Sequence, residues 1–385
     1  MEKLIILGAS GSIGTQALDV ASRYGVRVDG ISAHSRVESL CDSARKFKPR
    51  FAALTDEAAY AQAKLMLADT SVKLLCGKEG IEEMLASSDA DTVLNAIVGE
   101  AGLRPTVWTL REKKRLALAN KESLVCAGEI VMAMARENGE EILPVDSEHC
   151  AIHECLRSGS KDEVDELLVT ASGGPFFGLS REEMRAVTRE QALNHPTWSM
   201  GQKITVDSAT MMNKGFELIE AAHLFGVPMD KITPVVHRES IIHSMVRFTD
   251  GSVVAQMGNP DMRHCIAYAL FYPERRAVGT KKLDFASLGK MTFFAPDYEA
   301  FPLLSLAKEA FALGGAAPAV LNAANEEAVY AFLNGALSFY EIAEIVRGAL
   351  HKYAKEKGET LADIEAASLK TRLSIRELLG RDTRN

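Results

Sequence analysis

The stretch that decides the fold is Leu4-Ile5-Ile6-Leu7-Gly8-Ala9-Ser10-Gly11-Ser12-Ile13-Gly14. Its apolar half predicts a short buried strand, and its glycine-rich half predicts a tight turn that opens a helix ending near Tyr24. A second strand-like run follows from Val26 to Ile31. In such a βαβ unit, glycines allow the turn and helix N-terminal amides face a pyrophosphate. The GxxGxxG spacing is a variant of the usual fingerprint, and a glycine turn without a ligand is the alternative.

The second predicted strand ends near His34-Ser35-Arg36. An enzyme that uses NAD places an acidic residue here to bind the ribose 2′-hydroxyl, but the first acid in this chain is Glu38. Arg36 could instead bind a 2′-phosphate, which favours NADP. A solvated arginine in the first turn of the next helix is the alternative.

Strand-like and helix-like segments continue to alternate up to about residue 146. The further strands are predicted at 51–54, 72–76, 92–97, 115–119 and 142–145. Repeated βα units with short connections imply a doubly wound parallel sheet. Lys121 follows one of these strands, at the edge where such sheets bind ligands, although a lone lysine in a polar loop is usually only solvated.

Two carboxylates, Asp146 and Glu148, flank Ser147 directly after the last of these strands. In an extended backbone their side chains would point the same way and could hold a hard cation such as Mg²⁺ or Mn²⁺. The alternative is a helix start, with Asp146 or Ser147 as N-cap and Glu148 in the first turn. A third carboxylate, at Glu217, is the candidate that would favour the metal site.

The chain changes character after residue 146. A strand from Leu167 to Ala171 runs into a glycine turn, and a helical stretch is predicted near residues 180 to 192. The loop His195-Pro196-Thr197-Trp198-Ser199-Met200-Gly201 then gathers an imidazole and a large aromatic side chain between Pro and Gly. Trp198 could be a core residue or part of a lid that excludes water when a substrate binds.

A helix is predicted from Asp207 through Leu224. Asn213, Lys214 and Glu217 share one of its faces. They could form a plain surface pair, or a polar face directed into a cavity with donors for an anion and a metal ligand at Glu217.

Alternating segments about Asp250-Gly251 predict a β-hairpin. Residues 272–300 have little periodicity and are interpreted as a linker, whereas the sequence from 301 onward predicts about four helices in a small bundle. The expected fold is therefore an N-terminal Rossmann-like doubly wound parallel sheet, a central α+β domain and a C-terminal helical bundle. The expected boundaries are 1–146, 147–271, 272–300 and 301–385.

Composition narrows the class of protein. The 385 residues include 52 acidic and 44 basic ones, for a net charge of −8, which argues against nucleic-acid and anionic-membrane partners. No apolar run approaches the roughly 18 residues of a membrane span. The six cysteines are scattered without a CxxC pair, which indicates reduced thiols and no zinc site. We therefore expect a soluble cytoplasmic protein.

Several blocks, in order along the chain, resemble the 1-deoxy-D-xylulose 5-phosphate reductoisomerase family. The similarity extends from the glycine turn to at least Asn325. The blocks are Gly8 to Gly14, Ala119 to Val125, Leu143 to His149, Ser172 to Phe176, His195 to Gly201, Asp207 to Glu217 and Leu321 to Asn325. One departure concerns His34-Ser35-Arg36, where many relatives carry Gly-Lys-Asn, so the residue that holds the 2′-phosphate is open.

The resemblance implies a V-shaped three-domain subunit, a homodimer, and a reaction that needs NADPH and Mg²⁺ or Mn²⁺. In this family 1-deoxy-D-xylulose 5-phosphate, a phosphorylated sugar, is rearranged and then reduced to 2-C-methyl-D-erythritol 4-phosphate in the non-mevalonate isoprenoid pathway. The alternatives are another NADP-dependent dehydrogenase of a small anionic substrate, or a dinucleotide sensor without catalysis.

The resemblance also implies the roles of individual residues. The implied metal ligands are Asp146, Glu148 and Glu217, which with Lys121 and His195 form the implied catalytic set. The implied substrate-binding residues are Lys121, Ser147, Glu148, Ser172, His195, Trp198, Met200, Ser208, Asn213, Lys214 and Glu217. The implied cofactor-binding residues are Gly8, Ser10, Gly11, Ser12, Ile13, Gly14, His34, Ser35, Arg36, Asn120, Glu122, Gly201 and Met262.

Overall fold

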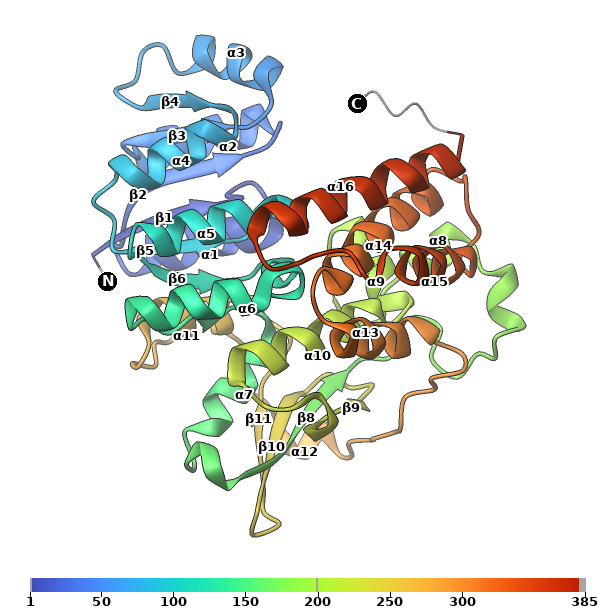
Figure 1. Ribbon diagram of the computed structural model, residues 1–385. Helices are drawn as coiled ribbons and strands as arrows, with labels where there is room; N and C mark the ends of the chain where they lie inside the picture. Colours follow the sequence, from blue (N-terminus) through green and yellow to red (C-terminus); the bar gives the residue numbers. More distant parts are fainter. Residues whose placement is uncertain (1, 199, 381–385) are drawn as a thin grey trace. The chain divides into compact units, whose positions relative to one another are not determined.

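The computed structural model describes residues 2–198 and 200–380 (Figure 1). Within this part the chain forms two compact units. The first consists of the chain up to Asn120, Val131–Cys150 and Asp261–Lys281, and the second of Lys121–Ile130, Ala151–Pro260 and the described residues from Lys282 onward. The expected functional boundaries at 146, 271 and 300 stay predictions.

The first unit is built on a seven-stranded parallel sheet with the order β4-β3-β2-β1-β5-β6-β7. Its strands are β1 (Lys3–Leu7), β2 (Arg27–Ala33), β3 (Phe51–Leu54), β4 (Lys73–Cys76), β5 (Thr92–Asn95), β6 (Arg115–Leu118) and β7 (Leu143–Pro144). The connecting helices are α1 (Ser12–Arg23), α2 (Val37–Phe47), α3 (Glu57–Met66), α4 (Gly77–Ser87) and α5 (Leu103–Arg111). Helix α6 (Lys121–Asn138) is kinked at Ala127, and only its part from Val131 onward belongs to the first unit. The order reverses at β1, which lies between β2 and β5, so the ends of β1 and β5 frame the switch point where such sheets bind ligands.

Both faces of this sheet are buried, which explains the unbroken apolar run in β1. Leu4 and Ile6 belong to one hydrophobic cluster, and the alternate residues Ile5 and Leu7 belong to another. Helix α11 (Met262–Phe271) comes from much later in the chain and packs against α1. This architecture confirms the predicted Rossmann-like sheet.

The second unit contains a four-stranded sheet with the order β11-β10-β8-β9. Its strands are β8 (Val164–Ala171), β9 (Ile232–Val236), β10 (Ile242–Phe248) and β11 (Val253–Met257). Strands β10 and β11 form the predicted hairpin about Asp250-Gly251, and β8 pairs with β10 antiparallel and with β9 parallel. Helices α8 (Arg189–Ala192), α9 (Gln202–Ala209) and α10 (Met212–Phe225) belong to the same unit.

The C-terminal part of the second unit consists of four long helices, as the sequence predicts: α13 (Pro302–Leu313), α14 (Ala317–Leu333), α15 (Glu341–Tyr353) and α16 (Leu361–Leu378). Every residue of α14 except Tyr330 is buried, and α14 packs against the other three helices and α9 (Figure 1). Leu167 of β8, Phe216 of α10 and Leu321 of α14 belong to one hydrophobic cluster. The second sheet and the C-terminal helices therefore share a core.

Two predicted helices differ from the observed ones. The helix predicted from Asp207 to Leu224 is wrong, because α9 begins at Gln202 and a break separates it from α10. At the break Met211 adopts a left-handed backbone conformation with φ of 63°. The helix predicted near 180–192 is only a 3-10 turn (Glu183–Ala186) and the short α8, because the backbone between them is extended at Val187.

The predicted linker, residues 272–300, contains one short helix, α12 (Phe285–Leu288), and an isolated bridge between Phe294 and Val236. None of the helices in the described part of the chain is long and apolar enough to cross a membrane. The six cysteines are free.

Candidate active site

The glycine turn after β1 has the close packing that its sequence predicts. Gly8 has a φ of +81°, and a Cβ atom there would lie 2.6 Å from the carbonyl oxygen of Ala96. A Cβ atom at Gly14 would lie 2.2 Å from the carbonyl oxygen of Gly8. Gly11 is the N-cap of α1 and provides no side-chain cap. The start of α1 thus suits the oxygens of a pyrophosphate, and Ser10, Ser12 and Ile13 lie in or beside the turn.

The structure brings Arg36 to this turn, although Ser10 is 26 residues away in the sequence. The Arg36 Nη1 donates a hydrogen bond of 2.9 Å to the carbonyl oxygen of Ser10. Beside it, the His34 Nδ1 lies 2.8 Å from the Thr55 hydroxyl. Ser35, between His34 and Arg36, is exposed. The structure thus places an exposed guanidinium next to the glycine turn.

Asn120 is buried and braces the loop that follows β5. Its side-chain amide donates to the carbonyl oxygens of Ile97 at 2.6 Å and Gly99 at 2.8 Å. A Cβ atom at Gly102 would lie 2.5 Å from the Asn120 side chain, so this loop and Asn120 are closely packed. The immediate effect of Asn120 is to shape the edge of the sheet at the switch point.

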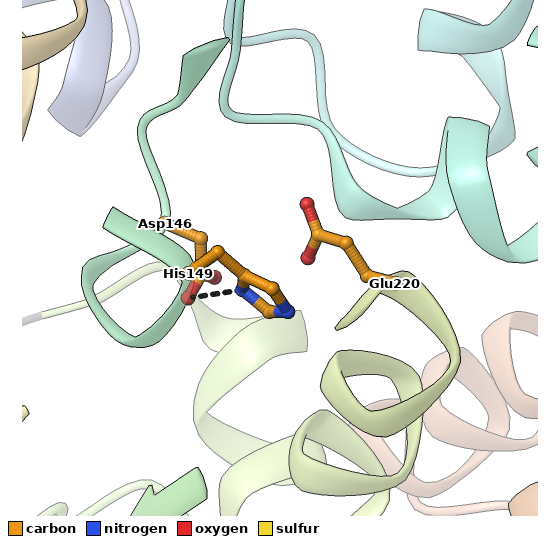
Figure 2. Close-up of side chains that lie close together, drawn as sticks. All are labelled: Asp146, His149 and Glu220. Atoms are coloured by element: carbon orange, nitrogen blue, oxygen red, sulfur yellow. Dashed lines mark hydrogen bonds and ion pairs between the residues drawn. The ribbon is translucent and has the colours of Figure 1, made fainter. Parts of the chain in front are cut away.

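The two carboxylates of the first unit lie at the start of α7 (Ser147–Leu156). Asp146 accepts a hydrogen bond of 3.3 Å from the Glu148 amide, and its carboxylate lies 3.3 Å from the His149 Nδ1 (Figure 2). The Ser147 hydroxyl donates to the Glu148 carboxylate at 2.6 Å. The helix-start interpretation is therefore right for the backbone, and the extended i, i+2 geometry is wrong. Helix capping does not remove the capacity of carboxylate oxygens to bind a cation.

In the second unit, Glu217 lies at the centre of a buried polar cluster. Its side chain is 1% exposed and accepts hydrogen bonds from Lys121 at 2.7 Å and Asn213 at 2.6 Å, as well as from Lys214. Lys121 also donates to the Asn213 side-chain oxygen at 3.1 Å. The surface-pair interpretation is wrong, because two ammonium groups and one carboxylate are buried together. Charged groups are costly to bury unless they are paired and hydrogen-bonded, as these are.

A second cluster of the same unit consists of Ser172, His195 and Ser208. The His195 Nε2 lies 3.0 Å from the Ser172 hydroxyl and 3.1 Å from the Ser208 hydroxyl. The His195 Nδ1 accepts hydrogen bonds from the amides of Thr197 and Trp198, at 3.1 and 2.9 Å. Because Nδ1 is an acceptor, the ring is neutral and carries its proton on Nε2. Burial, reinforced by the charge of Arg238, accordingly lowers the pKa of His195 to about 4. The three side chains form an uncharged cluster of hydrogen-bonding groups.

The other predicted residues lie around these clusters. The Trp198 ring is 6.1 Å from the His243 ring, and Gly201 is the N-cap of α9, directly after Met200. Met262 begins α11 in the first unit and packs beside Cys150, Cys265 and Tyr268. Ser199 lies outside the described residues.

Glu122 faces a lysine that the sequence did not single out. Lys203 Nζ lies 3.4 Å from the Glu122 carboxylate and 2.7 Å from the Asp207 carboxylate. Asp207 also accepts a hydrogen bond of 2.7 Å from the Asn325 side-chain amide. Glu122 follows Lys121, and Asp207 precedes Ser208. The buried lysine thereby ties together the segments that carry two candidate site residues. No local pattern distinguishes Lys203 from a solvated lysine at a helix start.

Protein-family models of 1-deoxy-D-xylulose 5-phosphate reductoisomerase match three segments of the chain. The family model itself matches residues 4–128, and two models of the C-terminal domain match residues 142–225 and 257–374. A 1-deoxy-D-xylulose 5-phosphate reductoisomerase of Caldanaerobacter subterraneus subsp. tengcongensis is 50% identical over 378 residues, which cover 97% of this chain and 98% of the relative.

The chain belongs to the 1-deoxy-D-xylulose 5-phosphate reductoisomerase family. A solved reductoisomerase of Zymomonas mobilis in complex with NADPH is 44% identical and has a TM-score of 0.91, with 98% of this chain and 99% of that chain covered. A second solved structure, in complex with NADPH, fosmidomycin and magnesium, is 40% identical with a TM-score of 0.92, and covers 99% of this chain and 98% of that chain. The family resemblance read from the sequence is confirmed.

For this reductoisomerase-family chain, the half-buried His195 predicts a specific pH dependence of stability. Between the usual pKa of 6.5 and about 4, the unfolded chain binds a proton at His195 and the folded chain does not. The free energy of unfolding should therefore decrease as the pH falls through this window. The variant His195→Gln cannot take up that proton and should lose stability less steeply, as measured by urea denaturation at pH 7.5, 6 and 5. The exposed His351→Gln is the control, and equal pH slopes for His195→Gln and the wild type would contradict the prediction.

Proposed function

We propose that the chain is an NADPH- and divalent-metal-dependent reductoisomerase that converts 1-deoxy-D-xylulose 5-phosphate to 2-C-methyl-D-erythritol 4-phosphate in the non-mevalonate isoprenoid pathway. The observation that carries the proposal is the buried cluster of Glu217, Lys121, Asn213 and Lys214 in a member of this family. A dehydrogenase without metal chemistry, or a sensor, has no need for a carboxylate buried between two lysines. Relatives solved with NADPH and with magnesium support the same assignment.

The first unit has the features that NADPH requires. The start of α1 offers amides to the pyrophosphate, and the glycines at 8 and 14 are positions where a side chain would collide with backbone. We propose that Arg36 binds the 2′-phosphate, with His34 and Ser35 beside it, and its hydrogen bond to the Ser10 carbonyl supports this. We further assign the nicotinamide side to Asn120, Glu122 and Met262, and we include Gly201 among the cofactor-binding residues.

The donor chemistry fits Mg²⁺ or Mn²⁺. Asp146, Glu148 and Glu217 offer carboxylate oxygens, the ligands that hard divalent cations prefer, and no sulfur ligand is needed. We propose that these three residues hold one ion. When bound, the ion supplies Lewis acidity at the substrate's carbonyl and neighbouring hydroxyl.

The remaining residues bind and orient the substrate. Lys121 and Ser147 are proposed to donate to its carbonyl and hydroxyl oxygens. Its phosphate is assigned to Ser172, His195, Ser208, Asn213 and Lys214. Trp198 and Met200 are proposed to cover the substrate and exclude water. Because the phosphate is remote from the bonds that change, its binding energy can position the reacting carbons.

We also propose the assembly, location and division of the chain. A homodimer is the expected assembly, with NADPH bound by residues 1–146 and catalysis and dimerisation assigned to 147–271. Residues 272–300 would act as a linker to the bundle of 301–385. Six free cysteines support a reducing, cytoplasmic location.

The direct test is the loss of NADPH absorbance with 1-deoxy-D-xylulose 5-phosphate. Turnover should require both the substrate and added Mg²⁺ or Mn²⁺, and a chelator should stop it until metal is restored. The product should contain the rearranged, branched carbon skeleton by NMR. Consumption of NADPH without metal, or only with another anionic substrate, would favour a plain dehydrogenase. NADPH binding without turnover of any such substrate would favour a sensor.

Arg36→Ala should weaken the use of NADPH selectively. Loss of a guanidinium from a phosphate site should raise the Michaelis constant for NADPH roughly tenfold or more and leave that for NADH within about twofold. Initial rates with each cofactor at saturating substrate measure this. The exposed Arg185→Ala is a control that should change neither constant. Equal effects on NADPH and NADH would remove Arg36 from the 2′-phosphate site.

A further inference from the structure

Arg238, which follows β9, is a residue that the proposed function does not use. Its guanidinium donates through Nη1 to two main-chain carbonyls, those of Ser172 and Gly174, the latter at 2.7 Å. It also stacks on the Phe177 ring, 5.1 Å from the ring centroid. Arg238 is thus half-buried directly behind the turn that presents Ser172.

The charge of Arg238 is not matched by an ion pair with any carboxylate of the described residues. The neighbouring Glu239 is directed elsewhere: it accepts from the Thr292 hydroxyl at 2.8 Å and lies 3.1 Å from the His237 Nδ1. Burial lowers the pKa of Arg238, and the nearby charge of Glu239 offsets this effect only in part, so the guanidinium is a positive charge that no close carboxylate balances.

The turn that Arg238 holds controls the geometry of the serine–histidine cluster. Gly173 and Gly174 have φ values of +76° and +66°, and the Gly174 amide donates to the Ser172 hydroxyl at 3.2 Å. A Cβ atom at Gly174 would lie 2.7 Å from the carbonyl oxygen of Ser208. Movement of this turn would therefore change the separation of the two serine hydroxyls on either side of His195.

The groups that surround His195 directly bring no charge of their own. The two serines and the neutral His195 offer hydrogen bonds, whereas the ammonium group of Lys214 is paired with Glu217. The field of Arg238 reaches the cluster, because its charge adds to burial in lowering the pKa of His195.

We propose that Arg238 is a positioning residue that determines anion specificity: it holds the 172–174 turn and places a positive charge behind Ser172, His195 and Ser208. The cluster thereby favours a doubly charged phosphate monoester over a singly charged group. The identity of the substrate rests on the proposed function, whereas the preference for a dianion can be tested with inorganic phosphate alone.

The test compares Arg238→Gln, which keeps a donor but no charge, with Arg238→Lys, which keeps the charge. The probes are inorganic phosphate and the singly charged nitrate, with dissociation constants measured by calorimetry on the full-length protein. Arg238→Gln should weaken phosphate binding about tenfold or more and nitrate binding no more than about threefold, and Arg238→Lys should restore most of the phosphate affinity. Arg247→Gln, which removes an arginine paired with Glu166, is the matched control and should bind phosphate like the wild type.

Kinetics provide the second readout. In Arg238→Gln the Michaelis constant for 1-deoxy-D-xylulose 5-phosphate should rise about tenfold, with kcat within about threefold and the constant for NADPH unchanged. Unchanged phosphate affinity in Arg238→Gln, or equal weakening in the Gln and Lys variants, would overturn the proposal, since equal loss indicates turn packing alone. If the melting temperature shows that Arg238→Gln does not fold, Arg238→Met, which also removes the charge, is measured in its place. Failure of the wild type to turn over the substrate would overturn the proposed function, while the phosphate measurements would still decide the role of Arg238.

Discussion

Glu217→Gln should lower kcat about a thousandfold or more while leaving NADPH affinity within about twofold of the wild type. Glutamine is nearly isosteric with glutamate, but it removes the negative charge that a divalent cation requires. It also leaves the ammonium groups of Lys121 and Lys214 without their shared carboxylate, whose side chain is 1% exposed. The measurements are steady-state turnover with titrated Mg²⁺ or Mn²⁺ and NADPH binding by fluorescence.

Loss of stability has to be separated from loss of metal binding in this variant. Removing one partner of a buried ion pair costs roughly 3 kcal/mol, so Glu217→Gln should also unfold at lower urea concentration. Glu327→Gln is the matched control, because Glu327 is a buried carboxylate of the same unit paired with Arg376 at 2.9 Å. It should lower stability and leave kcat near the wild-type value. Normal turnover with weakened NADPH binding in Glu217→Gln would refute the metal role of Glu217.

Gly14→Ala should weaken NADPH binding about a hundredfold and lower the free energy of unfolding by about 2 kcal/mol. The added Cβ would lie 2.2 Å from the carbonyl oxygen of Gly8 and 2.6 Å from the Cα of Ala9. Both are backbone atoms of the turn after β1, so the collision can be relieved only by moving the turn away from the start of α1. The measurements are NADPH titration and urea denaturation.

Gly348→Ala is the matched control for this substitution. Gly348 lies within α15, and a Cβ atom there would meet nothing within 4 Å. Replacing glycine by alanine in an open helical position should leave NADPH binding unchanged and raise stability by up to about 1 kcal/mol. If Gly14→Ala binds NADPH as tightly as Gly348→Ala, the turn can adapt to the added Cβ atom. Cofactor binding then does not require glycine at position 14.

Local sequence patterns predicted the elements whose conformation depends mainly on neighbouring residues. The parallel strands, the hairpin about Asp250-Gly251 and the four C-terminal helices were all predictable, because periodicity and turn residues are short-range signals. The single helix predicted through Met211 was wrong because the conformation there depends on distant residues and not on sequence neighbours. A methionine in the left-handed region carries no sequence signal, and the surrounding structure imposes it.

The candidate site shows the same division. The sequence alone allowed two interpretations of Glu217, a surface ion pair with Lys214 or a metal ligand in a cavity, because the helical spacing is the same in both cases. Burial decided the question, since Lys121, 96 residues away, meets Glu217 at 2.7 Å. The predicted convergence of Asp146 and Glu148 is confirmed, since a carboxylate oxygen of each lies within 4.8 Å of the other, but it arises at the start of α7 and not on an extended backbone.

By itself, the sequence determined the Rossmann-like order of elements, the glycine turn and, through ordered blocks of residues, membership of the reductoisomerase family. These depend on signals that lie within a few residues of each other or within a recognisable block. Only the tertiary structure decided that Glu217 is buried, that His195 is neutral, and that Arg238 supports the Ser172 turn from 66 residues away. Such contacts arise when distant segments pack together, and burial then sets the charge state of the groups that meet.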